Sequence, residues 1–341
     1  MAVTSVYFHP VFLEHDTGNH PEAADRLVVV KRRLEAGDLD LVWITPPRAD
    51  VVDVARVHTR GHIETVERIA RGGGGRLDMD TVVSPASFDA ALYAVGAGIH
   101  ATTRALGEGS RSFLLVRPPG HHAGRDRGMG FCLFNNIAVA AQYAIEELGV
   151  ARVLIVDWDV HHGNGTQDVF YDDPRVLLCG FHLGNHYPGT GAIAESGAGD
   201  GVGYTVNLPL PHGAGDGAVR AFFSDVLVPL AQEFRPELVL ISAGYDSVAG
   251  DPLGGLTLSD EAYRWMAGTI AGLCESVGAA GPVCFLEGGY DPERVASAVM
   301  RTLEGFHLPP GEISAKLSPR ESRALSDLRR ALEGTWGRVL R

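Results

Sequence analysis

A buried strand that ends in acids and histidines is the stretch of this sequence most able to do chemistry. Residues 153–157 (VLIVD) are apolar and mostly β-branched, which is typical of a strand inside a parallel sheet. Asp159 and His161 follow, two positions apart, so on an extended backbone both side chains point to the same side. A carboxylate and an imidazole placed in this way suit one borderline metal ion such as Zn²⁺. The alternative, a strand end with a helix cap, does not call for so many acids and histidines together.

Three further apolar runs are predicted to be strands that end in polar groups. They are residues 113–116, followed by His121 and His122; residues 238–242, followed by Asp246; and residues 283–286, followed by Tyr290. The carboxyl ends of parallel strands meet at one edge of a sheet, where α/β proteins place their active sites. If the four strands are neighbours, Asp159, His161 and Asp246 would be three protein ligands with one open position, which is the layout of a catalytic zinc site. The alternative for Asp246 is a turn or helix-cap residue.

The other polar residues of these strand ends suit proton transfer. Two neutral histidines, His121 and His122, could serve as general base and general acid beside an activated water, unless one of them is a core residue. Asp157 and Asn164 are the candidates to orient their second ring nitrogens. Tyr290 follows two glycines and could donate to the oxyanion formed when water attacks a carbonyl, although a lone Tyr is more often a core residue. The residues therefore predict metal-assisted hydrolysis of an amide or an ester.

The elements that must position these residues alternate between strand and helix along the chain. We predict helices near 26–34, 57–70, 87–106, 137–148, 216–234, 258–277 and 292–303, and additional strands near 5–8, 176–181 and 204–208. This alternation favours an α/β fold of three αβα layers with one mostly parallel central sheet. Residues 1–308 are expected to form the catalytic domain. Residues 309–341 are more charged and are expected to form a helical tail, with one amphipathic helix near 318–332.

Composition excludes several classes of function. The formal net charge of −13 argues against nucleic acid as a partner. We find no apolar run long enough to cross a membrane and no signal peptide, so neither a membrane partner nor secretion is expected. Four scattered cysteines are typical of reduced thiols in a cytoplasmic protein. The number of chains in the assembly is left open, a homo-oligomer included.

Six ordered motifs make the chain similar to the histone deacetylase superfamily over roughly residues 5 to 305. They are Arg117-Pro-Pro-Gly-His121-His122-Ala, Gly130-Phe131-Cys-Leu-Phe-Asn-Asn, Asp157-Trp-Asp-Val-His-His-Gly-Asn164-Gly-Thr-Gln, Tyr187-Pro-Gly-Thr-Gly191, Ala243-Gly-Tyr-Asp246 and Leu286-Glu-Gly-Gly-Tyr290. Asn164, where class I members have Asp, and the context of Trp158 resemble class II and its bacterial amidohydrolase relatives. The resemblance implies the arginase–deacetylase fold, one Zn²⁺ per chain, and hydrolysis of an N-acetylated amine to amine and acetate.

The resemblance also implies a role for individual residues. Asp159, His161 and Asp246 match the zinc ligands, and His122 matches the general base and acid. His121 matches an electrostatic histidine paired with Asp157, and Tyr290 matches the tyrosine that polarises the carbonyl. The implied substrate contacts are Gly130, Phe131 and Tyr187 in the tunnel, Leu253 at its mouth, and Asp80 at the rim. Arg26, by default a surface helix residue, matches an arginine of the internal acetate channel. A structural K⁺ is implied at the carbonyls of Asp157, Asp159, His161, Gly180 and Phe181.

This sequence departs from the family pattern at a few positions, and other functions remain open. Gly180 replaces the usual Ser at the potassium site, and Tyr187 and Tyr245 stand where Phe is more common. The implied substrate is a protein or peptide acetyl-lysine, with an acetylpolyamine or another small acylamine as the alternative. A non-catalytic acetyl-lysine binding protein is a remote alternative. A two-metal ureohydrolase would need acids where Gly163 and Val248 stand.

Overall fold

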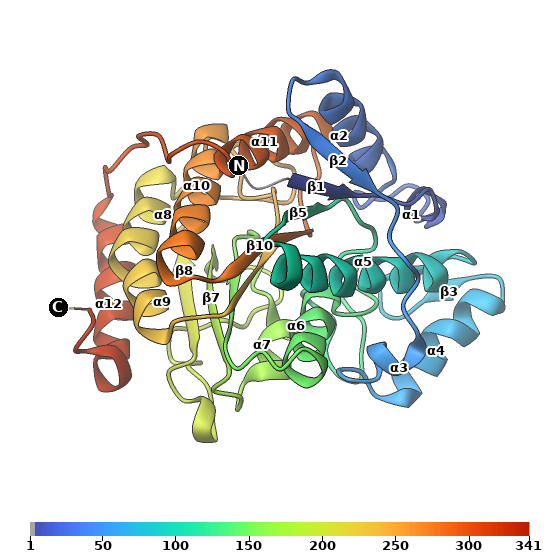
Figure 1. Ribbon diagram of the computed structural model, residues 1–341, viewed down its shortest axis with the longest axis horizontal. Helices are drawn as coiled ribbons and strands as arrows, with labels where there is room; N and C mark the ends of the chain where they lie inside the picture. Colours follow the sequence, from blue (N-terminus) through green and yellow to red (C-terminus); the bar gives the residue numbers. More distant parts are fainter. Residues whose placement is uncertain (1–3, 341) are drawn as a thin grey trace.

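Eight parallel strands form the central sheet of the molecule, which a computed structural model describes over residues 4–340 (Figure 1). The strand order is β2-β1-β5-β10-β9-β6-β7-β8, and every neighbouring pair is parallel. The strands are β1 Thr4–Tyr7, β2 Leu41–Ile44, β5 Arg111–Leu114, β6 Val153–Asp157, β7 Val176–Leu183, β8 Thr205–Leu210, β9 Leu238–Ala243 and β10 Ala280–Leu286. The inner strands are buried along almost their whole length, as their uninterrupted apolar sequences predict.

Helices cover both faces of this sheet (Figure 1). On one face α5 (Ser87–Glu108) packs against α6 (Asn136–Glu147), and on the other α10 (Asp260–Val277) and α11 (Pro292–Gly305) pack together with α2 (Asp25–Ala36). The remaining helices are α1 Val11–Glu14, α3 Val51–Val54, α4 Arg60–Arg71, α7 Asn164–Phe170, α8 Asp216–Phe222, α9 Val228–Phe234 and α12 Pro319–Trp336. The predicted three-layer αβα architecture is therefore confirmed.

Small residues let helix α5 lie unusually close to its neighbours. A Cβ atom on Gly98 would meet the Phe285 ring of β10 at 2.6 Å, and one on Gly96 would meet the Pro47 carbonyl at 2.0 Å. Neither contact is sterically allowed, so both positions need glycine. The close packing of α5 fixes β10, the strand that leads to Tyr290.

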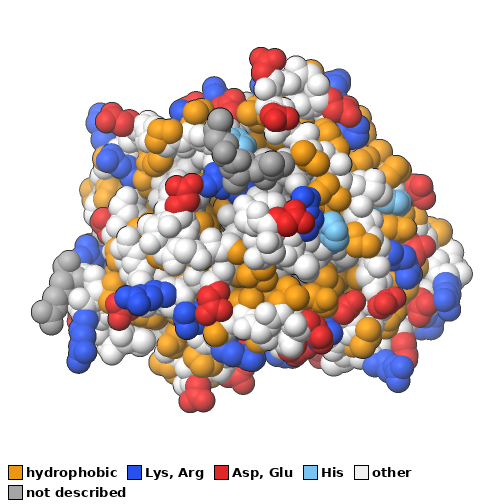
Figure 2. Space-filling model, in the orientation of Figure 1, with side chains coloured by type: hydrophobic (Ala, Val, Ile, Leu, Met, Phe, Trp, Pro, Cys, Tyr) orange, Lys and Arg blue, Asp and Glu red, His pale blue; other side chains and the backbone are white. Residues whose placement is uncertain are grey.

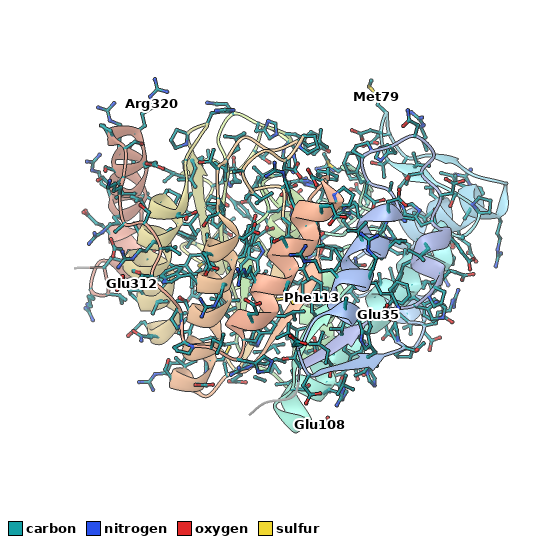
Figure 3. The ribbon with its side chains drawn as sticks, turned by 90° about the horizontal axis from the view of Figure 1, so that it is seen from above. Glu35, Met79, Glu108, Phe113, Glu312 and Arg320 are labelled. Carbon is teal, nitrogen blue, oxygen red and sulfur yellow. The ribbon has the colours of Figure 1, made fainter. Side chains whose placement is uncertain are left out.

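The strand order brings the four polar strand ends together. Strands β5, β10, β9 and β6 are consecutive in the sheet, so their carboxyl ends share one edge. In Figure 3 the loops of this edge lie at the top, between Met79 and Arg320, while Glu108 at the end of α5 lies at the opposite end. The condition stated above for a shared site, that the four strands are neighbours, is met.

Helix α12 covers the outer strand β8 and also contacts α8. Its side chains Leu325, Leu328 and Leu332 are buried, and the Trp336 indole N–H donates to the Gly203 carbonyl at 2.8 Å. A capping box at Ser318 starts the helix. The charged helix predicted for this region therefore exists and shields one edge of the sheet from pairing with another chain.

Some local structure differs from the prediction. Strand β2 was not predicted; it is a short edge strand with half-exposed residues and a weak pattern. A small antiparallel hairpin of β3 (Gly75–Arg76) and β4 (Val82–Val83), which follows the glycines at residues 72–74, was also not predicted. The single helix predicted for 216–234 contains a π-helical turn at Phe223–Leu227, between α8 and α9.

The surface and the thiols agree with the composition. Figure 2 shows acidic and basic side chains interspersed over the face in view. All four cysteines are buried free thiols. Within residues 4–340, each helix falls short of the length or the apolar character that spanning a bilayer requires.

Candidate active site

Three buried side chains converge where β6 and β9 end. Asp159 and His161 follow β6, Asp246 follows β9, and their potential ligand atoms all lie within 4.8 Å of one another. The His161 Nδ1 atom is 3.0 Å from Asp159 Oδ1 and 3.1 Å from Asp246 Oδ2. Asp246 Oδ2 is buried and accepts no well-directed hydrogen bond from the described residues. The three groups thus aim their lone pairs at one point, as the ligands of a metal ion do.

The charges of this group favour a cation. Burial and the Asp159 charge raise the pKa of the Asp246 carboxyl to about 7. Burial alone would lower the pKa of the His161 imidazole, but Asp159 and Asp246 raise it to about 10. The two buried carboxylates repel each other when both are ionised, and a divalent cation bound between them would neutralise their charge. The donor set of two oxygens and one nitrogen fits Zn²⁺.

Glycines make room for the two carboxylates. A Cβ on Gly288 would meet Asp246 Oδ2 at 2.0 Å, and a Cβ on Gly244 would meet Asp159 Oδ2 at the same distance. The Gly288 N–H donates to Asp159 Oδ2 at 2.8 Å, and the Val160 N–H donates to Asp246 Oδ1 at 2.9 Å. The backbone therefore fixes one oxygen of Asp246 and, because the His161 N–H also donates to Asp159 Oδ1 at 2.8 Å, both oxygens of Asp159. The glycines in the Ala-Gly-Tyr-Asp and Glu-Gly-Gly-Tyr motifs follow from this crowding.

The two histidines after β5 lie in different electrostatic surroundings. His121 Nδ1 is 3.0 Å from Asp157 Oδ2, and His121 Nε2 is 3.9 Å from Asp159 Oδ2. Burial would lower the pKa of His121, but the two carboxylates raise it to about 10. The pKa of His122 is held well below 6.5 by burial and by its histidine neighbours. The two pKa shifts therefore favour the protonated form of His121 and the neutral form of His122.

The hydrogen bond that His122 donates to Asn164 selects the tautomer of His122. His122 Nδ1 lies 2.8 Å from Asn164 Oδ1, and the amide nitrogen of Asn164 faces Met129 Sδ. Because an amide oxygen only accepts, Nδ1 carries the proton and Nε2 keeps its lone pair. The structure therefore pairs His121 with Asp157 and His122 with Asn164. The pairing of His121 with Asp157 is the one that the resemblance implies, whereas the sequence had named Asn164 without assigning it to a histidine.

A pocket of about 350 Å³ reaches the candidate ligands at His161. It is lined by Asp80, His122, Gly130, Phe131, His161, His186, Tyr187, Pro252, Leu253, Gly254 and Tyr290. All five predicted substrate contacts line it, together with His122, His161 and Tyr290. Its size lies in the range of small-molecule sites. A narrow apolar chain with an amide at its end would fit such a pocket.

Phe131 is held in a strained conformation at the pocket wall. Gly130 has φ 55° and Phe131 has φ 69°, so two consecutive residues lie in the left-handed region, which a phenylalanine rarely adopts. The Phe131 N–H donates to the Thr81 hydroxyl at 3.2 Å, and the His20 ring meets the Phe131 ring edge to face. The β3–β4 hairpin and the loop before α2 therefore hold this wall in place.

Arg26 is buried, against its default interpretation as a surface residue. Its guanidinium lies 5.1 Å from the centre of the Tyr290 ring and donates to the carbonyls of Glu287 and Gly289. It also forms an ion pair with Glu22, which is shared with the buried Arg117. The position behind Tyr290 agrees with the internal location that the resemblance implies.

The buried Glu22 should make stability depend on pH in the acid range. Burial would raise the pKa of this carboxyl, but Arg117 and other cations lower it from 4.5 to about 2, which is worth about 3 kcal/mol. Since the folded-state pKa is lowered, this stabilisation is complete above about pH 4.5 and is lost as the pH falls through about 2. We expect Glu22→Gln, which mimics the protonated acid, to lower the free energy of unfolding by about 3 kcal/mol at pH 7.

Urea denaturation of the parent and the Glu22→Gln variant at several pH values measures this difference. The deficit of the variant should shrink steadily between about pH 4.5 and about pH 2, where the parent carboxylate is itself protonated. The exposed Glu35, which pairs with Lys31 on α2, gives the matched control Glu35→Gln. A deficit that is constant over this pH range would contradict the proposed ionic role.

Three polar residues at the site were given no role from the sequence. Glu287 is buried, and its carboxylate accepts the N–H groups of Gly120 and His121, which fixes the loop before the histidine pair. Asp251 is buried beside Leu253 and Tyr290. The His186 ring stacks on the His161 ring at 5.1 Å. Glu287 lies within a quoted motif, His186 directly precedes one and Asp251 follows one by five positions, but only the three-dimensional contacts reveal what each residue does.

One small cavity is lined both by residues proposed for potassium and by Gly163, a position where a second metal would need an acid. Asp157, His161, Gly180 and Phe181 line this cavity beneath the candidate zinc ligands. A Cβ on Gly163 would meet Asp157 Oδ2 at 2.3 Å, so an acid at this position would not fit without rearrangement. The geometry thus gives no support to a second bridging metal.

Comparison with known proteins gives one consistent family. The sequence profile described as histone deacetylase domain matches residues 20–306. A probable deacetylase of Archaeoglobus fulgidus is 37% identical over 316 residues, which cover 90% of this chain and 88% of that protein. Histone deacetylase 10, chloroplastic, of Oryza sativa is 39% identical over 86% of this chain and 70% of its own length. The crystal structure of the HDA15 HD domain superposes with a TM-score of 0.93 at 34% identity and covers 99% of this chain and 96% of that one.

Proposed function

The chain belongs to the histone deacetylase family, and from this premise we propose that it is a zinc-dependent deacetylase that hydrolyses an N-acetylated amine of the acetyl-lysine type. The observation that carries the proposal is the convergence of three candidate ligands, a neutral histidine and a tyrosine on one narrow pocket. The products are a free amine and acetate. Because the proposed chemistry requires one metal, one base and one oxyanion donor, each can be tested by itself.

Asp159, His161 and Asp246 would hold the metal. A Zn²⁺ ion bound there supplies a Lewis acid that polarises the amide carbonyl and lowers the pKa of the attacking water. The donor types and the buried, unsatisfied Asp246 Oδ2 support this assignment. The carbonyls of Asp157, Asp159, His161, Gly180 and Phe181 would hold a structural K⁺. At Gly180 only the backbone can contribute.

Separate residues of the chain would transfer the proton and stabilise the negative charge. His122 accepts the proton of the attacking water at Nε2, because Asn164 fixes its other nitrogen as the donor. The Tyr290 hydroxyl donates to the oxygen that becomes negative as the carbonyl is attacked. His121, charged and paired with Asp157, stabilises the same negative charge. His122 returns the proton to the leaving amine. Arg26, behind Tyr290, lies where acetate would leave through an internal channel.

The pocket mouth favours acetyl-lysine peptides over acetylated polyamines. Leu253 lines the pocket and, at the mouth position that the resemblance implies, would offer methylene contact without a charge that would attract a second ammonium group. Asp80 lines the rim, where its carboxylate could accept backbone N–H groups of a peptide. An acetylpolyamine or another small acylamine is the second candidate substrate, because the pocket itself accepts any narrow apolar chain.

A single charge at the mouth should shift this preference. We expect wild-type kcat/KM to be higher for an acetyl-lysine peptide than for acetylspermidine, and Leu253→Glu to shift the ratio toward the polyamine by about tenfold, or 1.4 kcal/mol. Leu253→Gln, of similar size but uncharged, is the matched control and should leave the ratio almost unchanged. A wild-type enzyme that prefers acetylspermidine tenfold would overturn the assignment of the substrate while leaving the deacetylase chemistry intact.

One panel of substrates tests the proposed function directly. Purified zinc-loaded protein is incubated with acyl-lysine peptides, acetylputrescine, acetylspermidine and ester analogues, and the release of acetate is measured. We expect turnover of at least one acetylated amine. Binding of acetyl-lysine peptides without any release of acetate would instead support a non-catalytic acetyl-lysine binding protein.

A further inference from the structure

We propose that Asp251 is a positioning residue that holds the Tyr290 hydroxyl in place for the reaction; this inference rests on the proposed function. Asp251 lies in the loop after β9, is only 9% exposed and contacts the loop after β10. Its Oδ2 atom accepts the Tyr290 N–H at 2.6 Å and the Asp291 N–H at 3.3 Å. Its Oδ1 atom accepts the Leu253 N–H at 2.9 Å. Both oxygens are therefore occupied by backbone donors.

One peptide group is fixed at both of its ends. The peptide between Gly289 and Tyr290 presents its carbonyl to the Arg26 guanidinium and its N–H to Asp251. These two contacts set the plane of that peptide and therefore the direction in which the Tyr290 side chain leaves the backbone. Gly289 has φ 113°, so the turn is open to many backbone conformations unless outside contacts select one. Asp251 and Arg26 supply that selection.

The same carboxylate connects Tyr290 to the pocket mouth. Leu253, whose N–H binds Asp251, lines the pocket, and its carbonyl faces His186 Nε2 at 3.2 Å. The loop that contacts the substrate chain and the residue that polarises its carbonyl are thus held by one buried side chain. A donor for an oxyanion must be placed within a few tenths of an ångström, because its contribution depends on being oriented before the reaction.

A double-mutant cycle separates positioning from general stability. Asp251→Asn is isosteric but puts an N–H₂ donor against one of the backbone N–H groups. We expect Asp251→Asn to lower kcat roughly 10- to 100-fold, which reaches the lower end of the effect of losing an oxyanion donor. KM should stay within about threefold of the parent value, and the metal content should be unchanged. In a Tyr290→Phe background the same change should lower kcat by less than about twofold, because the hydroxyl it positions is gone.

A binding measurement supplies a readout that does not depend on turnover. A trifluoromethyl ketone analogue of acetyl-lysine hydrates to a mimic of the attacked carbonyl, and calorimetry measures its affinity for the metal-loaded proteins. Asp251→Asn and Tyr290→Phe should each weaken its binding, and the double variant should bind no more weakly than Tyr290→Phe alone. Asp173, which accepts the Arg175 N–H far from the site, gives the matched control Asp173→Asn, expected to behave as the parent.

The outcomes distinguish this inference from the proposed function. An inactive parent protein that does not bind the analogue contradicts the proposed function itself. An active parent in which Asp251→Asn lowers kcat equally with and without the Tyr290 hydroxyl, or changes KM alone, overturns the positioning role. If the Asn variant does not fold, Asp251→Glu, which keeps both acceptors but displaces them, is carried through the same cycle with the same expectations.

Discussion

Asp246→Ala is expected to abolish both metal binding and hydrolysis. Asp246 supplies one of three candidate ligands, and its Oδ2 atom lies 3.1 Å from His161 Nδ1 and has no hydrogen-bond donor among residues 4–340. Removal leaves two ligands, too few for a tightly held Zn²⁺. Substituting a residue that only orients a metal ligand lowers metal affinity roughly 10- to 100-fold. The loss of metal affinity in Asp246→Ala should exceed this value. Elemental analysis of purified protein should find about one zinc per parent chain and almost none in the variant.

A second variant separates the metal from the backbone contact of Asp246. Because Asp246 Oδ1 also accepts the Val160 N–H, Ala removes a structural acceptor together with a ligand. Asp246→Asn keeps an oxygen for Val160 and exchanges the other oxygen for an amide nitrogen, which does not bind zinc. Loss of metal in both variants, with Asp173→Asn retaining it, assigns the loss to the ligand. Two tightly held metals per parent chain, or full activity after chelation, would contradict a single-zinc site.

The strand ends explain why so much of the site could be predicted from the sequence. Buried parallel strands are continuous apolar runs, so their ends are easy to locate, and all such ends lie on one edge of the sheet. Asp159, His161, Asp246 and Tyr290 each come within a few residues of such an end. These side chains converge because β5, β10, β9 and β6 are neighbours in the sheet. The order of strands is a long-range property that the local pattern does not contain.

Contacts between distant loops could not be predicted in the same way. Asp251 binds the backbone at Tyr290, 39 positions away, and Arg26 binds the carbonyl of Gly289, 263 positions away. Both residues are charged and lie in polar loop or helix sequences, where charges usually face water. Strand β2 was not predicted for a related reason. It lies at the sheet edge and is half exposed, so its hydrophobic pattern is weak. In each case tertiary packing decides the outcome.

His122→Ala should lower kcat by roughly 10²- to 10⁴-fold, the contribution of a general base, while the metal content stays at the parent value. The geometry separates this histidine from its neighbour. His122 is neutral, because burial and nearby histidines lower its pKa, and its Nδ1 proton is directed to Asn164. His121 is held as a cation by Asp157 and Asp159 and has no lone pair to offer. His122, which also lines the pocket, is therefore the histidine suited to accept a proton from water.

Rescue by added imidazole distinguishes a lost base from a damaged fold. His122 lines the open pocket, so the Ala variant leaves room beside the attacking water for an imidazole molecule from solution. Activity should rise with imidazole concentration in His122→Ala but not in Tyr290→Phe, which lacks the oxyanion donor instead. His100, which binds the Tyr7 hydroxyl on the far side of α5, gives the control His100→Ala, expected to keep the parent kcat. Parent-like activity of His122→Ala without imidazole would show that another group removes the proton.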